Sequence, residues 1–267
     1  MGASNGDFHS CFEKRGILWC RALSIVVTLI SGTLFASRPK VNDLCGVHLR
    51  SQAQAVQLYV EHHINHIVVC EVRPGFVGST SDRANSEIFN GVPTIRVDSV
   101  VGVNETEVTH ELFHLKLLVQ GISLKGMRVP IQQTPREKSI NSGSMYKLAT
   151  DLHAYFQHRL FYESMAAMGL KPYEATNREV ELDIKEGNHP AYARSVPEEL
   201  AVQLLPFLDQ PKAISALVEK WYRDQGWGRQ VEDAITIHKI IEVRNPTTQA
   251  GMASTFQECW GILFPLV

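Results

Sequence analysis

The sequence predicts an α+β protein in which a small sheet is followed by a mostly helical C-terminal half. Two β-branched apolar runs, at residues 67–72 and 94–98, have the length and composition of strands. From about residue 144 onward the apolar residues recur at helical spacing. This order predicts strands on the N-terminal side with helices packed behind them. A chain of 267 residues, 44% hydrophobic, can bury one large core.

The elements of the N-terminal half follow from local patterns. Residues 50–63 have apolar residues at helical spacing and predict a helix. Residues 67–72 predict a buried strand, and residues 74–90, with two glycines and a Ser-Thr-Ser run, predict a polar loop. Residues 94–98 alternate apolar and polar positions, which predicts a half-buried strand.

The C-terminal half is predicted to be helical. A long helix from about 144 to 168 ends at Gly169, and the segment between Gly121 and this helix is irregular enough to be a loop over a cleft. Beyond a break at 187–195, helices are predicted at 198–208, 212–223 and 232–243, and the apolar tail 255–267 should pack on the core. A helical subdomain could begin at about residue 173.

The first 40 residues differ from the others. Three basic residues precede an uncharged apolar run from Ala22 to Ala36, and Arg38-Pro39-Lys40 closes it. This pattern predicts a signal peptide or signal anchor over 1–40, with the functional domain at 41–267 in a secreted or membrane-anchored protein. The run is short for a membrane span of about twenty residues. A buried helix of the domain is the alternative.

Cys11 and Cys20 lie within the predicted signal segment. The other three cysteines, Cys45, Cys70 and Cys259, permit one disulfide and one free thiol in an exported chain. Their odd number gives no connectivity.

The motif with chemical content is His110-Glu111-Leu112-Phe113-His114. On a helix, positions i and i+4 share one face, so the two imidazoles can bind one zinc ion. The intervening Glu111 can then reach a water held by that ion. Asn104 can cap this helix in a capping box, and Gly121 can end it.

With this motif the chain resembles the zincin metallopeptidases. The resemblance implies zinc as cofactor, Glu111 as general base, a peptide or protein substrate, and a strand at 94–98 forming the sheet edge that pairs with the substrate. The metzincin extension is absent, because Leu117 and Gln120 stand where Gly and His are needed. Thermolysin-like proteins place a Glu about twenty residues downstream, where this chain has a loop-like Gln132-Gln133-Thr134.

The third ligand must therefore come from elsewhere, and the helix 144–168 offers candidates. His158 and Asp151 fall on its apolar stripe, whereas His153 is expected to point away from His158. We favour His158 as the third ligand, with Asp151 as its support or as the ligand itself. Glu163, Glu137 and His153 are weaker alternatives, and a core His158 bonded to Asp151 is the structural alternative.

Other polar residues have simpler interpretations. Tyr155 could donate a hydrogen bond to an oxyanion, but core packing is the favoured interpretation. The cluster His62, His63 and His66 is typical of a solvated helix end, and His238 is expected to be structural.

Together these features predict a zinc-dependent hydrolase, best described as a metallopeptidase. The alternative is a catalytically silent exported or membrane-associated zincin-like binding protein, and a third interpretation is a chance match to the motif. The formal net charge of −2 gives no indication of a nucleic-acid partner. The N-terminal segment could associate with a membrane.

Overall fold

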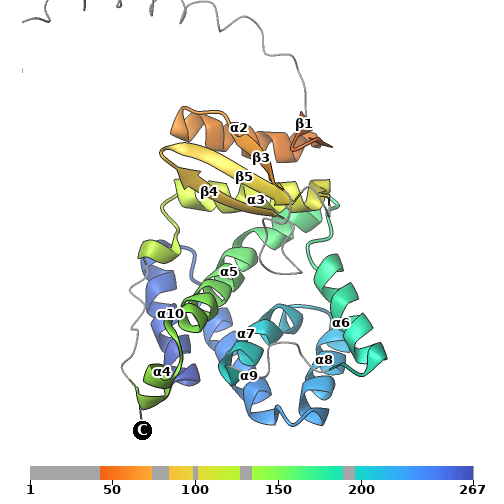
Figure 1. The fold of residues 1–267 in the computed structure, drawn as a ribbon, viewed down its shortest axis with the longest axis vertical. Helices are drawn as coiled ribbons and strands as arrows, with labels where there is room; N and C mark the ends of the chain where they lie inside the picture. Colours follow the sequence, from red (N-terminus) through yellow and green to blue (C-terminus); the bar gives the residue numbers. More distant parts are fainter. Residues whose placement is uncertain (1–42, 74–83, 99–101, 127–133, 189–195, 267) are drawn as a thin grey trace, which may run out of the picture. The chain divides into compact units, whose positions relative to one another are not determined.

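The computed structural model describes residues 43–73, 84–98, 102–126, 134–188 and 196–266. Within these residues the protein is α+β, as predicted: small sheets come first in the chain and a mostly helical half follows (Figure 1). Residues 1–42, which contain the predicted signal or anchor, lie outside the described residues, so that prediction stays untested. None of the described helices is long and apolar enough to cross a membrane.

The described part of the chain contains five short strands, in two sheets. The strands β1 (Asp43–Leu44) and β2 (Val47–His48) form an antiparallel pair. In the main sheet, β5 (Val92–Asp98) lies between β3 (Val69–Arg73) and β4 (Ala84–Phe89), parallel to β3 and antiparallel to β4. The expectation that residues 94–98 form a sheet edge is therefore wrong, because β5 has a partner on each side.

Strand β4 corrects the loop predicted over 74–90. The strand pairs with β5 through Phe89 opposite Val92, which leaves Asn90 and Gly91 as a two-residue hairpin loop. Both loop residues have positive φ, 50° and 78°, as this kind of tight turn requires. Asn-Gly between two strands is a strong hairpin signal, and it was outweighed by the polar residues before it. Residues 74–83 lie outside the described part.

Two helices pack beside this sheet. The helices α2 (Ser51–Ile64) and α3 (Glu105–Val119) contact each other, and both contact β5. Ile95 and Val97 of β5 are buried in the same apolar core as the inner faces of these helices. Residues 67–72 were predicted to be a buried strand, but Ile67 and Val72 are more than half exposed.

A disulfide joins Cys45, in the β1–β2 hairpin, to Cys70 of β3. It closes a loop of 25 residues and ties the start of the described chain to the main sheet. Cys259 is free and buried, and burial raises the pKa of its thiol to about 12. One disulfide and one free thiol is the arrangement that the cysteine count permitted.

In the helical half, the described residues form a short 3-10 turn, η1, and seven α-helices. Their bounds are η1 Leu124–Gly126, α4 Pro135–Ser139, α5 Ser142–Ala167, α6 Glu174–Glu186, α7 Pro197–Leu208, α8 Lys212–Asp224, α9 Gly228–Arg244 and α10 Gln249–Leu263. Helices α5 and α7 to α9 agree with the predicted ranges to within a few residues. Helices α4, α6 and α10 were not predicted as helices; for the tail that contains most of α10, only packing on the core was predicted.

Helix α4 is held at both ends by side chains. Thr134 and Glu137 form a capping box, with Pro135 in the first helical turn. Glu137 is buried and also accepts a hydrogen bond of 2.8 Å from the indole of Trp260 in α10. The apolar tail therefore packs on the core, as expected, and the hydrogen bond of Trp260 links α10 to α4.

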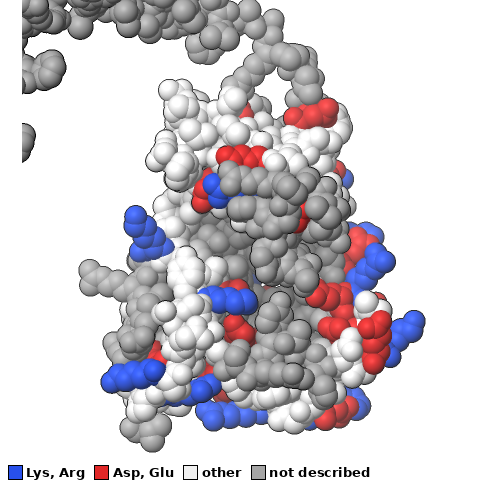
Figure 2. Space-filling model, in the orientation of Figure 1, with Lys and Arg blue, Asp and Glu red and all other residues white. Residues whose placement is uncertain are grey.

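One cluster of buried apolar side chains runs from Leu44 near the sheet to Phe264 at the end of α10. Helix α5 is central to it, because it contacts α3, α7 and α10 (Figure 1). On the face shown in Figure 2, acidic and basic side chains are interspersed over the helical half. This mixed distribution matches the small net charge, and the predicted lack of a nucleic-acid partner stays a prediction.

Candidate metal centre

Helix α3 is defined at both ends by its sequence. The Asn104 side chain accepts a hydrogen bond of 3.1 Å from the Glu107 amide, and the Glu107 carboxylate accepts one of 2.9 Å from the Asn104 amide. At the other end Gly121, with φ 81°, reverses the chain, and the Ile122 amide bonds the Leu117 carbonyl at 2.9 Å. These caps fix the register that places His110 and His114 on one face.

Helix α5 begins at a similar cap, because the Asn141 side chain accepts a hydrogen bond of 2.9 Å from the Ser144 amide. Its middle packs against α3. That contact brings His158 against the pair on α3, as the apolar stripe of α5 predicted.

The three imidazoles converge at their Nε2 atoms. The Nε2 of His114 lies 2.9 Å from that of His110 and 3.3 Å from that of His158. One ring nitrogen from each of the three lies within 4.8 Å of the others. Tetrahedral zinc with zinc–nitrogen distances of about 2.0–2.1 Å separates its nitrogens by about 3.3–3.4 Å. The spacing of this donor set therefore suits a metal of that size.

Burial keeps these imidazoles neutral. It lowers the pKa of His110 and of His158 well below the usual range, and neighbouring histidine charges add to the effect. Burial also lowers the pKa of His114 to about 4, opposed by its hydrogen bond to Gln157. Neutral imidazole is the form that binds metal ions, so the cluster is ready to bind without first losing protons near neutral pH.

Aromatic rings surround the cluster. Phe161 meets the rings of His110, His114 and His158 nearly edge-on, at centroid distances of 5.2–5.6 Å. Tyr162 stacks on His158 at 4.6 Å, with the ring planes 10° apart. These contacts hold the imidazole planes and exclude water from one side of them.

Glu111 follows His110 on α3 and is 8% exposed. Burial raises the pKa of Tyr162, and the charges of Tyr173 and Glu111 contribute to the rise. The Tyr162 ring also contacts that of His110, at a centroid distance of 5.7 Å, so Tyr162 lies beside the residue that precedes Glu111. Sequence reasoning placed Tyr162 only on the apolar stripe of α5, and its position one turn after His158 was the signal that could have singled it out.

The alternative third ligands lie elsewhere. Asp151 is paired with Lys147 at 2.5 Å and does not belong to the convergent group. Glu137 caps α4, and Glu163 is exposed. His153, expected to point away from His158 and off the apolar stripe, is nevertheless buried: it is 5% exposed, and its Nε2 atom has no hydrogen-bond partner within the described residues. Helix α5 is buried over more of its circumference than a single stripe, which explains this burial.

Tyr155 has the packing role that was favoured for it. It is 3% exposed, and its hydroxyl accepts a hydrogen bond of 3.2 Å from Arg159. Arg159 also pairs with Asp209 at 2.5 Å, and the Nε2 of His238 lies 3.0 Å from the same carboxylate. Tyr155, Arg159, Asp209 and His238 form a polar cluster, called the Arg159 cluster below, and none of them belongs to the convergent histidines.

The group of histidines at the end of α2 is solvated, as expected. His62, His63 and His66 are exposed at the end of α2. His189 lies outside the described residues.

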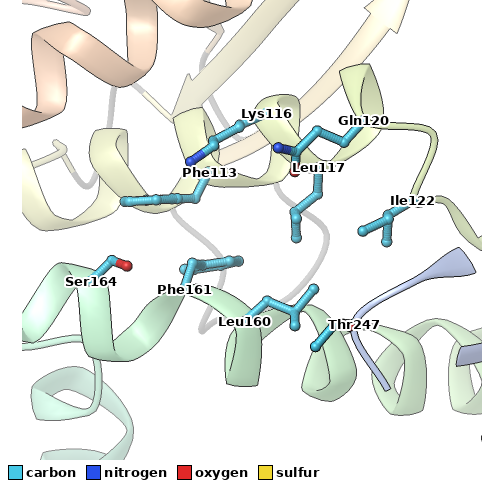
Figure 3. Close-up of a pocket in the computed structure, with 9 residues that line it drawn as sticks. All are labelled: Phe113, Lys116, Leu117, Gln120, Ile122, Leu160, Phe161, Ser164 and Thr247. Atoms are coloured by element: carbon cyan, nitrogen blue, oxygen red, sulfur yellow. The ribbon is translucent and has the colours of Figure 1, made fainter. Parts of the chain in front are cut away.

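A cavity of about 200 Å³ adjoins the histidine cluster (Figure 3). Its walls come mainly from α3 and α5, with Ile122 and Thr247 from the segments beyond α3 and before α10. The rings of Phe113 and Phe161, which both line it, stack on each other at 5.1 Å. Phe161 also contacts the imidazoles, but no histidine lines the cavity. The cavity is therefore a neighbour of the histidine cluster and does not contain it.

No family model, curated protein or solved structure matches this chain.

Proposed function

We propose that this chain is a zinc-dependent hydrolase, and specifically a metallopeptidase. The observation that carries the proposal is the convergence of His110, His114 and His158 at one point, with Glu111 on the same helix as the first two. Three neutral imidazoles suit zinc among the metals that nitrogen ligands bind. The resemblance of the motif to that of zincins is the further reason to propose zinc as the metal and peptides as the substrates.

The roles of the residues follow from their positions. His110, His114 and His158 would hold the ion, and three protein ligands would leave it an open position. When bound, zinc would polarise a scissile carbonyl and lower the pKa of a water towards about 7. Glu111 would accept the proton of the attacking water and return it to the leaving amine. Low exposure of Glu111 would strengthen its interactions during the transfer.

The sheet offers an edge for an extended substrate. The strand expected for this role, β5, is central, but among the described strands β4 lies at an edge of the main sheet, and it packs against α3. A peptide that adds to β4 would lie beside the helix that carries Glu111. We therefore propose a zincin-like fold in which β4 is the edge strand that pairs with an extended substrate.

We also propose that the protein acts outside the cytoplasm. The disulfide between Cys45 and Cys70 supports this, because structural disulfides persist in oxidising compartments. The basic and apolar N-terminal segment of the sequence points the same way.

The test uses the purified full chain. Zinc content should be about one ion per chain, and a peptide library should be cleaved. Glu111→Gln should keep zinc and fold but lose at least about a hundredfold in cleavage rate, because an amide keeps the shape without the basicity. Glu163→Gln is the matched control, since Glu163 is exposed on α5 and should leave activity unchanged.

The outcomes separate the alternatives. A chain that binds no zinc would refute the metal centre. One that binds zinc stoichiometrically but cleaves no peptide would be the silent binding protein. Equal cleavage by wild type and Glu111→Gln would show that Glu111 is not the base.

A further inference from the structure

We infer that Gln157 is a positioning residue that fixes His114 in the tautomer needed for metal binding. The inference rests on the proposed zinc centre and concerns a residue that no motif identifies. Gln157 lies on α5 directly before His158, and its side chain Oε1 is 2.9 Å from the Nδ1 of His114.

The ring of His114 is held between two neighbouring side chains of α5. Gln157 contacts its Nδ1, and His158 lies 3.3 Å from its Nε2. Adjacent helical residues project about 100° apart, so one turn of α5 can reach both sides of the same ring. The helix that supplies the third imidazole therefore also orients the second.

The direction of the Gln157 amide is set by a second contact. Its Nε2 donates to the carbonyl oxygen of Ile122 at 3.4 Å, which turns Oε1 towards His114. Ile122 belongs to the capped end of α3, where its own amide bonds the Leu117 carbonyl. The acceptor for His114 is thus anchored to the end of the helix that carries His114.

This arrangement determines where the imidazole proton resides. A neutral imidazole has one N–H, and the hydrogen bond made by one nitrogen decides the state of the other. Oε1 can only accept, so the proton lies on Nδ1 and the Nε2 lone pair faces His110 and His158. Gln157 is 6% exposed, so water cannot readily take over this role.

The contact also preserves the charge of the site. An amide accepts the Nδ1 proton without adding a negative charge, whereas a carboxylate in this place would add one. Within the described residues, His114 is the one member of the cluster whose Nδ1 has a hydrogen-bond partner. Gln157 therefore orients His114 through a hydrogen bond, in addition to the ring contacts that Phe161 makes with all three imidazoles.

The experiment measures zinc affinity of the full chain by competitive chelator titration. Gln157→Met removes the acceptor at similar size and should weaken zinc binding about ten- to a hundredfold. Gln157→Glu retains an acceptor and should bind within about tenfold of wild type, since a carboxylate accepts the same proton more strongly. Gln120→Met, at the exposed end of α3, is the matched control and should bind like wild type.

Each result has a distinct meaning. If wild type binds no zinc, the proposed function fails and the inference fails with it. If wild type binds zinc and Gln157→Met binds equally well, only the inference is overturned. If Gln157→Glu loses as much affinity as Gln157→Met while both unfold at the same temperature as metal-free wild type, the acceptor role is refuted. Should Gln157→Met fail to fold, the comparison of Gln157→Glu with wild type still decides the matter.

Discussion

Helix α5 carries two polar clusters that differ in how their groups are compensated. The histidine cluster, His110, His114 and His158, brings together three groups of the same kind whose lone pairs meet at one point. In the Arg159 cluster, a guanidinium, a carboxylate, an imidazole and a hydroxyl complement one another. His158 and Arg159 are adjacent in sequence, yet each belongs to a different cluster.

The difference separates a binding site from a structural one. Arg159 and Asp209 have opposite charges, so the Arg159 cluster needs no further group to be satisfied. Neutral imidazoles that meet at their lone pairs gain from an additional cation between them. Burial alone does not distinguish the two clusters. The clusters differ in whether the charges of neighbouring groups oppose each other, and four experiments can test this distinction.

The largest effect is expected from removing the third imidazole. His158→Ala should lower zinc affinity by several orders of magnitude, because a two-ligand remnant binds weakly. Asp151→Asn is the matched change on the same helix and should leave affinity within about twofold, because Asp151 pairs with Lys147 instead. Chelator titration of both variants measures this. Loss of zinc in Asp151→Asn with retention in His158→Ala would reverse the assignment.

The Arg159 cluster should give the opposite result. Asp209→Asn removes the charge that pairs with Arg159 and contacts His238, and should lower the free energy of unfolding by about 1.5–3 kcal/mol. Zinc affinity should stay unchanged, since Asp209 does not belong to the convergent histidines. Urea unfolding with chelator present gives the stability, and titration gives the affinity. A loss of zinc without a loss of stability would contradict the division into two clusters.

Much of the histidine cluster could be predicted from the sequence because it depends on local signals. The capping box at Asn104 and the glycine at 121 fixed the register of α3, and the apolar spacing of α5 placed His158 against it. That these residues bind zinc remains a prediction. Gln157 could not be predicted, because no motif marks an amide in this position and its contact with His114 depends on how α5 packs against α3.

The errors in the fold have a common origin in competing signals. The polar residues before Asn90 outweighed the signal of a hairpin turn, so strand β4 was missed. Because β4 pairs with β5, the strand β5 is central in the sheet and not at its edge. Helix α6 is mostly exposed and has few apolar residues, so its apolar stripe is narrow. The burial of His153 was not predicted, because neighbours bury α5 on more than one side, which helical spacing alone does not reveal.

Acid should destabilise the metal-free protein through the histidine cluster. The pKa of His114 is about 4 in the folded chain and about 6.5 when unfolded, so the unfolded state binds more protons between these values. Stability is therefore fully present above about pH 6.5 and falls as the pH drops towards 4, by roughly 1–3 kcal/mol for this residue. Urea unfolding from pH 4.5 to 7.5 with chelator measures the slope. In His114→Gln the decline should be shallower, and identical slopes would contradict the shift.

The smallest effect concerns His153, which belongs to neither cluster. Its pKa is lowered to about 4, first by burial and then by the charge of His114, and within the described residues its Nε2 has no hydrogen-bond partner. A buried polar atom without a partner costs free energy, so an apolar side chain of similar size should be tolerated or slightly preferred. His153→Leu should therefore change the free energy of unfolding at pH 7.5 by between zero and about 1 kcal/mol in the stabilising direction. Zinc affinity should match wild type, whereas His158→Leu, the same change five residues away, should lose the metal. If His153→Leu weakened zinc binding tenfold or more, His153 would belong to the histidine cluster. The metal-binding part of α5 would then begin about one helical turn before His158.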